Sequence, residues 1–378
     1  MTESALPVWP KLYPETGATG WLKCHNQDFC VVEIPQALPC GEGEHIWLEI
    51  EKNGVNTGWI AKQLADLVGV KEMDVGYAGL KDRHAITRQW FSIYLPLVRL
   101  PNGEPDFSFI EKNDDGEQIK ILQVKRHSKK LRRGELLGNR FEIRLRDISY
   151  NDGADKAALE RNLELVKQSG VPNYFGEQRF GHNGGNIEAS RQMLTGEITV
   201  KNRSKKSIYL SAARSLIFNE VVAARIKQQT QSQMLDGDIA AEQQLNGQPI
   251  ATAPLWGRGR LQTSADVLVL ETEVAERYAD ICEGLEHKGL NQERRALIAA
   301  VENLTWQWAD SAPEMAASGD PAWQGSSGED LTLCFSLPSG YYATSVIREL
   351  LSPLERTPVW QIDGGPSENS NSQTSNKS

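Results

Sequence analysis

The feature that most limits how this chain can fold is a strand pattern near its far end, separated from the other strand-like segments by a long helical middle. Leu331, Leu333, Phe335 and Leu337 are apolar at every second position, as in a half-buried strand. A lone strand leaves its backbone groups unpaired, so this one needs partners. Pairing with strands from the first part of the chain is the economical solution, and it makes the middle an insertion into one sheet-based domain.

Strand patterns are frequent in the first part of the chain. Phe141, Ile143 and Leu145 alternate with charged residues, so one face of this segment belongs to a core. Residues 57–68 instead carry apolar side chains at helical spacing after an Asn-Gly turn, which predicts a helix. Further strands are expected at residues 29–34, 46–50, 73–78, 89–95 and 119–125.

The period becomes helical near Asp155. Apolar stripes predict helices at residues 156–169 and 210–227, and another from Asn291 through Val301. A short helix is expected near residues 344–351, after the last strand. This order favours an α+β fold with a mixed, mainly antiparallel sheet and a large helix-rich insertion. We place the sheet domain at residues 1–165 and 318–362, the insertion at residues 166–317 and a disordered polar tail at residues 363–378.

Composition is that of a soluble globular protein. The chain has 378 residues, 39% of them hydrophobic and 24% charged, and this length favours about two domains. It has no apolar run of membrane-spanning length and no signal-peptide layout at its start, so we expect a cytoplasmic protein. The 5 cysteines include no C-x-x-C pair, which argues for free thiols and against a metal site.

Charge is unevenly distributed along the chain. The net charge is −9, yet residues 120–146 hold ten Lys or Arg against two Glu, and residues 201–225 hold six against one. Acidic residues collect instead in residues 101–119 and 302–330. A phosphate responds to the local field and not to the total charge, so this segregation suits a protein that binds a polyanion.

Asp82 has the setting of a nucleophile. It lies in a loop expected between two strands, with Lys81, Arg83, His84 and Arg88 close by in sequence. Nearby positive charge lowers the pKa of a carboxylate and keeps it ionised at neutral pH. An ionised, oriented carboxylate can attack an electrophilic carbon. An ordinary turn aspartate that caps its own backbone is the alternative.

Other motifs point away from the common nucleotide and hydrolase classes. The sequence contains no P-loop, no H-E-x-x-H and no G-x-S-x-G, and Gly41–Glu44 lacks the third glycine of a dinucleotide fingerprint. Residues 171–181 combine aromatic, amide and guanidinium groups, which would serve either base stacking or a buried domain hinge. Residues 125–133 are strongly basic and lead into the strand that begins near Phe141.

Taken together, these segments resemble the TruD family of tRNA pseudouridine synthases. The resemblance runs over roughly residues 20–351 with the motifs in the family's order, and this ordered set is more specific than any one motif. The motifs are Lys23, Asp28-Phe29, Gly41-Glu42-Gly43-Glu44-His45, Asn53-Gly54, Asn56-Thr57, Ala78-Gly79-Leu80-Lys81-Asp82, Gly138-Asn139-Arg140-Phe141, residues 172–181, Leu210-Ser211-Ala212-Ala213-Arg214-Ser215, Phe218-Asn219, Glu293-Arg294-Arg295-Ala296, Leu337-Pro338, Gly340 and Ala343-Thr344-Ser345.

The resemblance implies an α+β pseudouridine-synthase domain with an inserted TruD domain, in agreement with the order of elements above. It implies that Asp82 is the catalytic aspartate of an isomerase that makes pseudouridine at position thirteen of tRNA. Tyr342 stands where the family usually has Phe, so the aromatic wall is retained and the role of the hydroxyl is open. We expect Arg83 or another nearby cation to orient Asp82. The remaining substrate-binding candidates are Lys23, Phe29, Asn139, Phe141 and Tyr342.

The reaction sets the other requirements. Isomerisation consumes no electron or group donor, so we expect no cofactor and no metal. Asp82 attacks either the anomeric carbon or the base ring, and the target base has to leave the RNA fold at a cost of a few kcal/mol. We expect tRNA as partner, no membrane, no obligatory protein partner and a monomer. The expected contacts to the RNA backbone are Lys125, Arg126, Lys129, Lys130, Arg132, Arg133, Arg179, Lys205 and Lys206.

Two other functions are compatible with the same residues. A nucleoside hydrolase also breaks a sugar bond with carboxylates, but it normally needs an acid partner, and the Asp82 loop holds no second Asp or Glu. A non-catalytic RNA-binding or RNA-chaperone protein could use the same fold without chemistry. Release of tritium from base-labelled uridine separates these cases, because a binder releases none.

Overall fold

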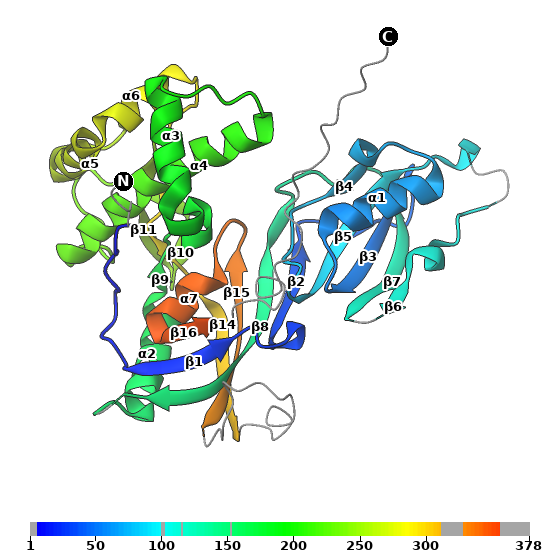
Figure 1. The fold of residues 1–378 in the computed structure, drawn as a ribbon, viewed down its shortest axis with the longest axis horizontal. Coiled ribbons are helices and arrows are strands. Elements are labelled where there is room, and N and C mark those ends of the chain that lie inside the picture. The colour runs from blue at the N-terminus through cyan, green and yellow to red at the C-terminus, as the bar shows by residue number, and fades with distance from the viewer. Residues whose placement is uncertain (1–5, 100–102, 115, 152, 311–327, 356–378) are drawn as a thin grey trace, which may run out of the picture.

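The computed structural model describes residues 6–99, 103–114, 116–151, 153–310 and 328–355, and it has the expected mixed α+β fold. Its main sheet has 11 strands, eight of them in the order β14-β15-β8-β2-β5-β3-β7-β6, and its ladders are mainly antiparallel. A lobe with α1 lies on one side of β2, β8 and β15, and a helical lobe with α3 to α6 lies on the other (Figure 1). The strands of this sheet are β1 (Ala18–Leu22), β2 (Phe29–Pro35), β3 (His45–Asn53), β4 (Val75–Tyr77), β5 (Ile86–Tyr94), β6 (Lys112–Asp114), β7 (Glu117–His127), β8 (Leu136–Tyr150), β14 (Glu302–Asp310), β15 (Glu329–Pro338) and β16 (Ser352–Glu355).

The far-end strand pairs with the N-terminal strands, as predicted. β15 runs antiparallel to β8, with Phe335 opposite Phe141 and Leu337 opposite Asn139. On its other side β15 pairs with β14, which lies in the stretch that we assigned to the insertion. The inward residues of β8 and β15 share one core with α2 (Lys156–Ser169) and α7 (Ala343–Leu350). Assembly of the main sheet therefore depends on contacts between distant parts of the chain.

The first lobe is built around α1 (Thr57–Val68), at the bounds predicted from the sequence. Ile60 and Leu64 are fully buried in a core shared with β3 and β5. The helix ends at Gly69, whose φ of 69° is a left-handed conformation that glycine adopts without strain. Short 3-10 helices complete this part of the chain at Asn26–Asp28, Glu72–Asp74, Leu97–Arg99 and Phe107–Ile110.

The helical lobe packs around a long helix. α4 (Arg203–Lys227) is buried over most of its second half, where Leu216, Ile217 and Val221 join the core. Around it lie α3 (Gly185–Thr195), α5 (Ala265–Arg277), α6 (Ala279–His287), the small sheet of β10 (Ala240–Leu245), β11 (Gln248–Leu255) and β12 (Glu293–Ala296), the pair β9 (Val171–Pro172) and β13 (Ile298–Ala299), and 3-10 turns at Glu177–Phe180 and His182–Gly184.

The helix predicted from Asn291 through Val301 is wrong. These residues form β12, which pairs with β11, and β13, which pairs with β9. This stretch does not form an apolar stripe opposite a solvent-exposed face, because four consecutive residues are all buried: Ala296, Leu297, Ile298 and Ala299. A continuous apolar run of this kind suits a fully buried strand as well as a helix, and the run alone could not separate the two.

The N-terminal segment joins the two cores. Trp9 packs in the core of the helical lobe and donates to Glu220 on α4 at 2.9 Å. A few residues later, the amides of Leu12 and Tyr13 donate to the buried carboxylate of Glu349 on α7, at 2.8 and 3.2 Å. Figure 1 shows this segment running from the helical lobe to β1. We refer to residues 6–16 as the N-terminal strap.

The contacts described above do not test the predictions for the C-terminal tail and the domain boundaries. The tail at residues 363–378 lies outside the described residues, and the domain boundaries stay predictions. Across the described ranges, no helix combines the length and apolarity needed to cross a bilayer.

Candidate active site

Asp82 lies in the loop between β4 and β5 and is held in a defined orientation. One carboxylate oxygen forms an ion pair with the Lys23 amino group, just after β1, and the other accepts the His84 amide at 3.0 Å. Its side chain is 36% exposed, so a substrate can reach it. Lys23, and not Arg83, is the cation that touches this carboxylate.

The electrostatics keep Asp82 ionised. Burial acts to raise the pKa of this carboxyl, but the charge and hydrogen bond of Lys23 and the amide of His84 outweigh burial, so the pKa lies below its ordinary value. The carboxylate therefore exists as an anion at neutral pH, which is the reactive form of an aspartate nucleophile.

The backbone of the Asp82 loop is pinned from several sides. The buried Lys52 amino group donates to the Asp82 carbonyl at 2.7 Å, and burial lowers the pKa of Lys52 to about 8. The Lys81 amino group pairs with the buried Glu33 on β2 at 2.8 Å. The Lys81 amide also donates to Thr57 at the start of α1. These contacts fix where the carboxylate can lie, which is the requirement for an oriented nucleophile.

Aromatic rings extend from the ion pair into the sheet. The Lys23 amino group lies 4.3 Å from the centroid of the Phe29 ring at the start of β2. Phe29 meets Phe141 edge to face at 6.2 Å, and Phe141 stacks on Phe335 at 5.3 Å. Strand alternation places these rings on one face of neighbouring strands. The structure thus brings Asp82, Lys23, Phe29 and Phe141 together.

Asn139 has an unused acceptor in the same region. It lies on β8 opposite Glu33 of β2 and Leu337 of β15. Its Oδ1 is buried and has no hydrogen-bond partner among the described residues. A buried acceptor without a partner is costly, so a site with this geometry gains from a ligand that carries an N–H donor.

Two candidates are placed apart from this cluster. Arg83 donates to the Gly54 carbonyl at 2.8 Å and pairs with Glu117 at 3.1 Å. Tyr342, just before α7, packs on the helical lobe, where its ring lies 5.9 Å from Phe175 and its hydroxyl accepts from Arg179 at 2.5 Å. The described contacts therefore connect neither residue to Asp82 directly.

The basic residues expected to meet RNA fall into two groups. The first group already has protein partners: Arg126 pairs with Glu104 at 2.7 Å, Lys130 donates to the Met73 carbonyl, Arg133 donates to Tyr77, and Arg179 donates to Ser211 and Tyr342. The second group is exposed and consists of Lys125, Lys129, Arg132, Lys205 and Lys206. Exposed cations can turn toward a phosphate at little cost.

Sequence reasoning missed several residues of the site. Lys52 contacts Asp82, Phe335 contacts Phe141, and Glu33 pairs with Lys81, the residue before Asp82. Each of the three lies within a strand and shows no motif of its own. A charged residue at an inward position of a strand is the signal that could have found Glu33, since it shares a face with Phe29 and Val31.

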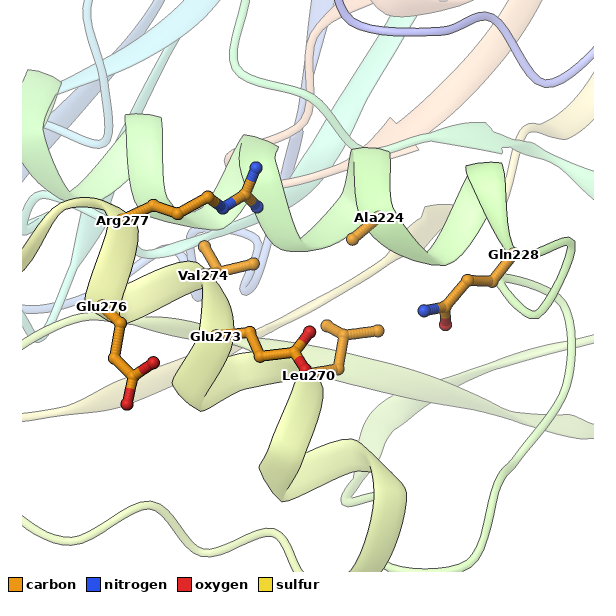
Figure 2. A pocket seen from close by; sticks show the side chains of 7 residues that line it. All are labelled: Ala224, Gln228, Leu270, Glu273, Val274, Glu276 and Arg277. Carbon is orange, nitrogen blue, oxygen red and sulfur yellow. The ribbon is translucent and has the colours of Figure 1, made fainter.

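The hollow shown in Figure 2 is a separate feature. It measures about 430 Å³ and lies between α4 and α5, lined by Ala224, Gln228, Leu270, Glu273, Val274, Glu276 and Arg277. None of these residues belongs to the Asp82 cluster, and the set lacks an aromatic ring for a base. Among the described residues, no group of three or more His, Cys, Asp or Glu is placed to hold a metal ion.

Comparison with known proteins identifies relatives over most of the chain. The family model described as "tRNA pseudouridine synthase D (TruD)" matches residues 12–201 and 194–350. A protein of Aeromonas salmonicida named tRNA pseudouridine synthase D is 43% identical over 91% of this chain and 94% of its own length. One of Cellvibrio japonicus with the same name is 42% identical over 91% and 93%. A solved Methanosarcina mazei structure described as TruD has the same fold, with a TM-score of 0.65, 20% identity, and coverage of 92% of this chain and 96% of that one. The chain therefore belongs to the TruD family of tRNA pseudouridine synthases.

Proposed function

We propose that this protein converts uridine to pseudouridine in tRNA, at position 13, with Asp82 as the nucleophile. Family membership supports the reaction and the class of substrate. The observation that carries the assignment of the nucleophile is the ionised, reachable Asp82 carboxylate beside Lys23 and the Phe29 ring.

The chemistry needs one nucleophile and no added reactant. Asp82 forms a transient bond to the anomeric carbon or to the base ring while the bond between that carbon and N1 breaks. The detached base turns, its C5 bonds to the anomeric carbon and the bond to Asp82 breaks, which regenerates the carboxylate. C5 then loses its proton and N1 gains one. Substrate and product are isomers, so a cofactor has no role in the balance. Lys23 holds the carboxylate in its reactive form and orientation.

The detached base has to stay in the pocket while it turns. Phe29 and Phe141 supply apolar ring surface, and Tyr342 supplies a further aromatic wall from the side of the helical lobe. The free Oδ1 of Asn139 fits the N3–H donor on the edge of uracil, because that bond would satisfy a buried acceptor. In this scheme Arg83 does not touch the Asp82 carboxylate. Its side chain donates to the Gly54 carbonyl and so helps to hold the backbone of the Asp82 loop in place.

RNA binding comes from the basic segments on the two lobes. Lys125, Lys129 and Arg132 belong to the first lobe, and Lys205 and Lys206 lie in the first turn of α4. Contacts to phosphates on both lobes offset the cost of extruding the base, and binding then weakens steeply with salt. In this proposal the protein acts as a cytoplasmic monomer. Light scattering at catalytic concentrations tests the oligomeric state.

The function is tested with an unmodified tRNA transcript that carries tritium at C5 of uridine. Isomerisation releases one tritium per target site, and a transcript with cytidine at position 13 releases none. Tritium release from both transcripts overturns the position, whereas no release from either overturns the activity and leaves an RNA binder. Release of free uracil identifies a hydrolase.

A further inference from the structure

Two arginines of the helical lobe gather around one ring next to Tyr342. The guanidinium carbons of Arg179 and Arg295 lie 5.5 and 4.4 Å from the centroid of Phe175. Arg295 also lies 5.0 Å from the Tyr341 ring. Arg179 follows β9 in the chain and Arg295 lies on β12, so folding of the lobe brings them together.

Neither arginine faces a carboxylate within the described part of the chain. Arg179 donates to the hydroxyls of Ser211 at 2.9 Å and of Tyr342 at 2.5 Å. Arg295 donates to the Gly340 carbonyl at 2.9 Å and to Asn173 Oδ1 at 2.5 Å. These acceptors are all neutral, so they orient the guanidinium groups without neutralising them.

Two other arginines of the helical lobe are neutralised. Arg225 makes a two-fold contact with Asp238, and Arg294, the neighbour of Arg295, pairs with Glu271 at 2.6 Å. The chain therefore compensates buried guanidinium groups elsewhere and leaves this pair positive. Burial lowers the pKa of Arg295 and the nearby Arg179 acts in the same direction, while Tyr341 and Tyr342 oppose both.

Hydrogen-bonding capacity remains on both side chains. A guanidinium group carries five N–H donors in a fixed fork, and two on each arginine are committed to the acceptors above. The Arg295 Nε is buried with no partner among the described residues. Free forked donors and uncompensated charge match the oxygens of a phosphate.

We propose that Arg179 and Arg295 form a binding site for a backbone phosphate of the RNA substrate, and that the Tyr342 hydroxyl positions Arg179 within it. This rests on the proposed function, since it takes the RNA as ligand. Phe175 serves as the platform that holds both guanidinium groups. The Tyr342 hydroxyl thereby acts on a phosphate contact and not on the base.

The test measures tRNA affinity against NaCl concentration in the full chain carrying Asp82→Asn, so that no turnover disturbs the equilibrium. Arg179→Gln should lower the slope of log K against log salt by about 0.7 to 0.9, the value for one lost phosphate contact. Arg191→Gln is the matched control, because Arg191 lies in the same lobe, is paired with Asp280, and should leave the slope unchanged. An unchanged slope in Arg179→Gln overturns the phosphate site.

Tyr342→Phe, with Asp82 intact, tests the positioning role. It should raise KM several-fold and leave kcat within about twofold, because the chemistry keeps its aromatic wall and only the orientation of Arg179 is lost. A fall in kcat at constant KM would mean that the Tyr342 hydroxyl acts on the target base instead, which overturns the positioning role. Tritium release by the parent protein is measured alongside: if the parent is active and the slopes do not differ, only this inference fails, and if the parent is inactive, the proposed function fails.

Discussion

The Asp82 loop and the Arg179–Arg295 pair use positive charge in opposite ways. Around Asp82, Lys23 and Lys81 each meet a carboxylate, and Lys52 is tied to a backbone carbonyl. Around Phe175, two guanidinium groups meet neutral acceptors. Paired cations hold a protein group in place, whereas uncompensated cations attract an anion from outside. In the proposed mechanism, the charge that orients the nucleophile is therefore separate from the charge that binds the substrate.

The largest expected effect comes from removing the charge of the nucleophile. Asp82→Asn keeps the shape of the side chain and should lower kcat by at least about 10³-fold, since no other carboxylate contacts Lys23 in the described structure. Single-turnover tritium release measures it. Binding of tRNA should stay within a few-fold of the parent, and near-parental turnover would show that Asp82 is not the nucleophile.

The next effect concerns stability and not chemistry. Lys81→Met leaves Glu33 buried and unpaired, which should destabilise the fold by about 3–5 kcal/mol. Urea unfolding followed by tryptophan fluorescence measures this loss. The double variant Lys81→Met with Glu33→Gln should lose less, because no buried charge remains without a partner. Equal stability of the single variant and the parent would contradict the role of this pair.

Removing the orienting cation sharpens the comparison through pH. Lys23→Met leaves the effect of burial on Asp82 less opposed, so the pKa of the carboxyl rises and the acid limb of kcat moves to higher pH. At neutral pH kcat should fall by roughly 10²-fold, as expected for a displaced catalytic group. The pH profile measures both, and an acid limb at the parental position would mean that Lys23 does not govern the ionisation of Asp82.

The smallest effect separates exposed from paired cations in the first basic segment. Arg132 is exposed, whereas Arg126 pairs with Glu104 and donates to the Leu95 carbonyl. Arg132→Gln should weaken tRNA binding a few-fold and reduce the salt slope by about one unit or slightly less. Arg126→Gln should alter thermal stability and leave that slope in place. The reverse outcome would assign the phosphate contact to Arg126.

Local patterns predicted those elements whose faces differ clearly. The bounds of α1 and α2 follow from apolar stripes that end at Gly69 and Gly170, and the alternation in β15 predicted its pairing with the early strands. The helix prediction failed at residues 296–299 because this run is buried on all sides. Periodicity reports a contrast between two faces, and such a run has none.

Site residues were predicted from the sequence only where the type of residue itself indicated its chemical role. Asp82, Lys23 and Phe29 were singled out by motif, and the structure brings them into contact. Lys52 was missed, and Arg295 was named within a motif but given no role, because what matters is which distant groups they meet: the Asp82 carbonyl and the Phe175 ring. Pairing of charges across the fold is a tertiary property, and it cannot be predicted from the residues next to each charge in the sequence.

The N-terminal strap has a consequence for how the protein is made. The amides of Leu12 and Tyr13 donate to the carboxylate of Glu349, which is synthesised 337 and 336 residues later. β8 likewise waits for β15. The helical lobe can collapse during synthesis, whereas the main sheet stays incomplete until β15 has been made, and long-range pairing of this kind is slow. A nascent chain stalled before β15 therefore lacks the strand that completes the sheet beside Asp82.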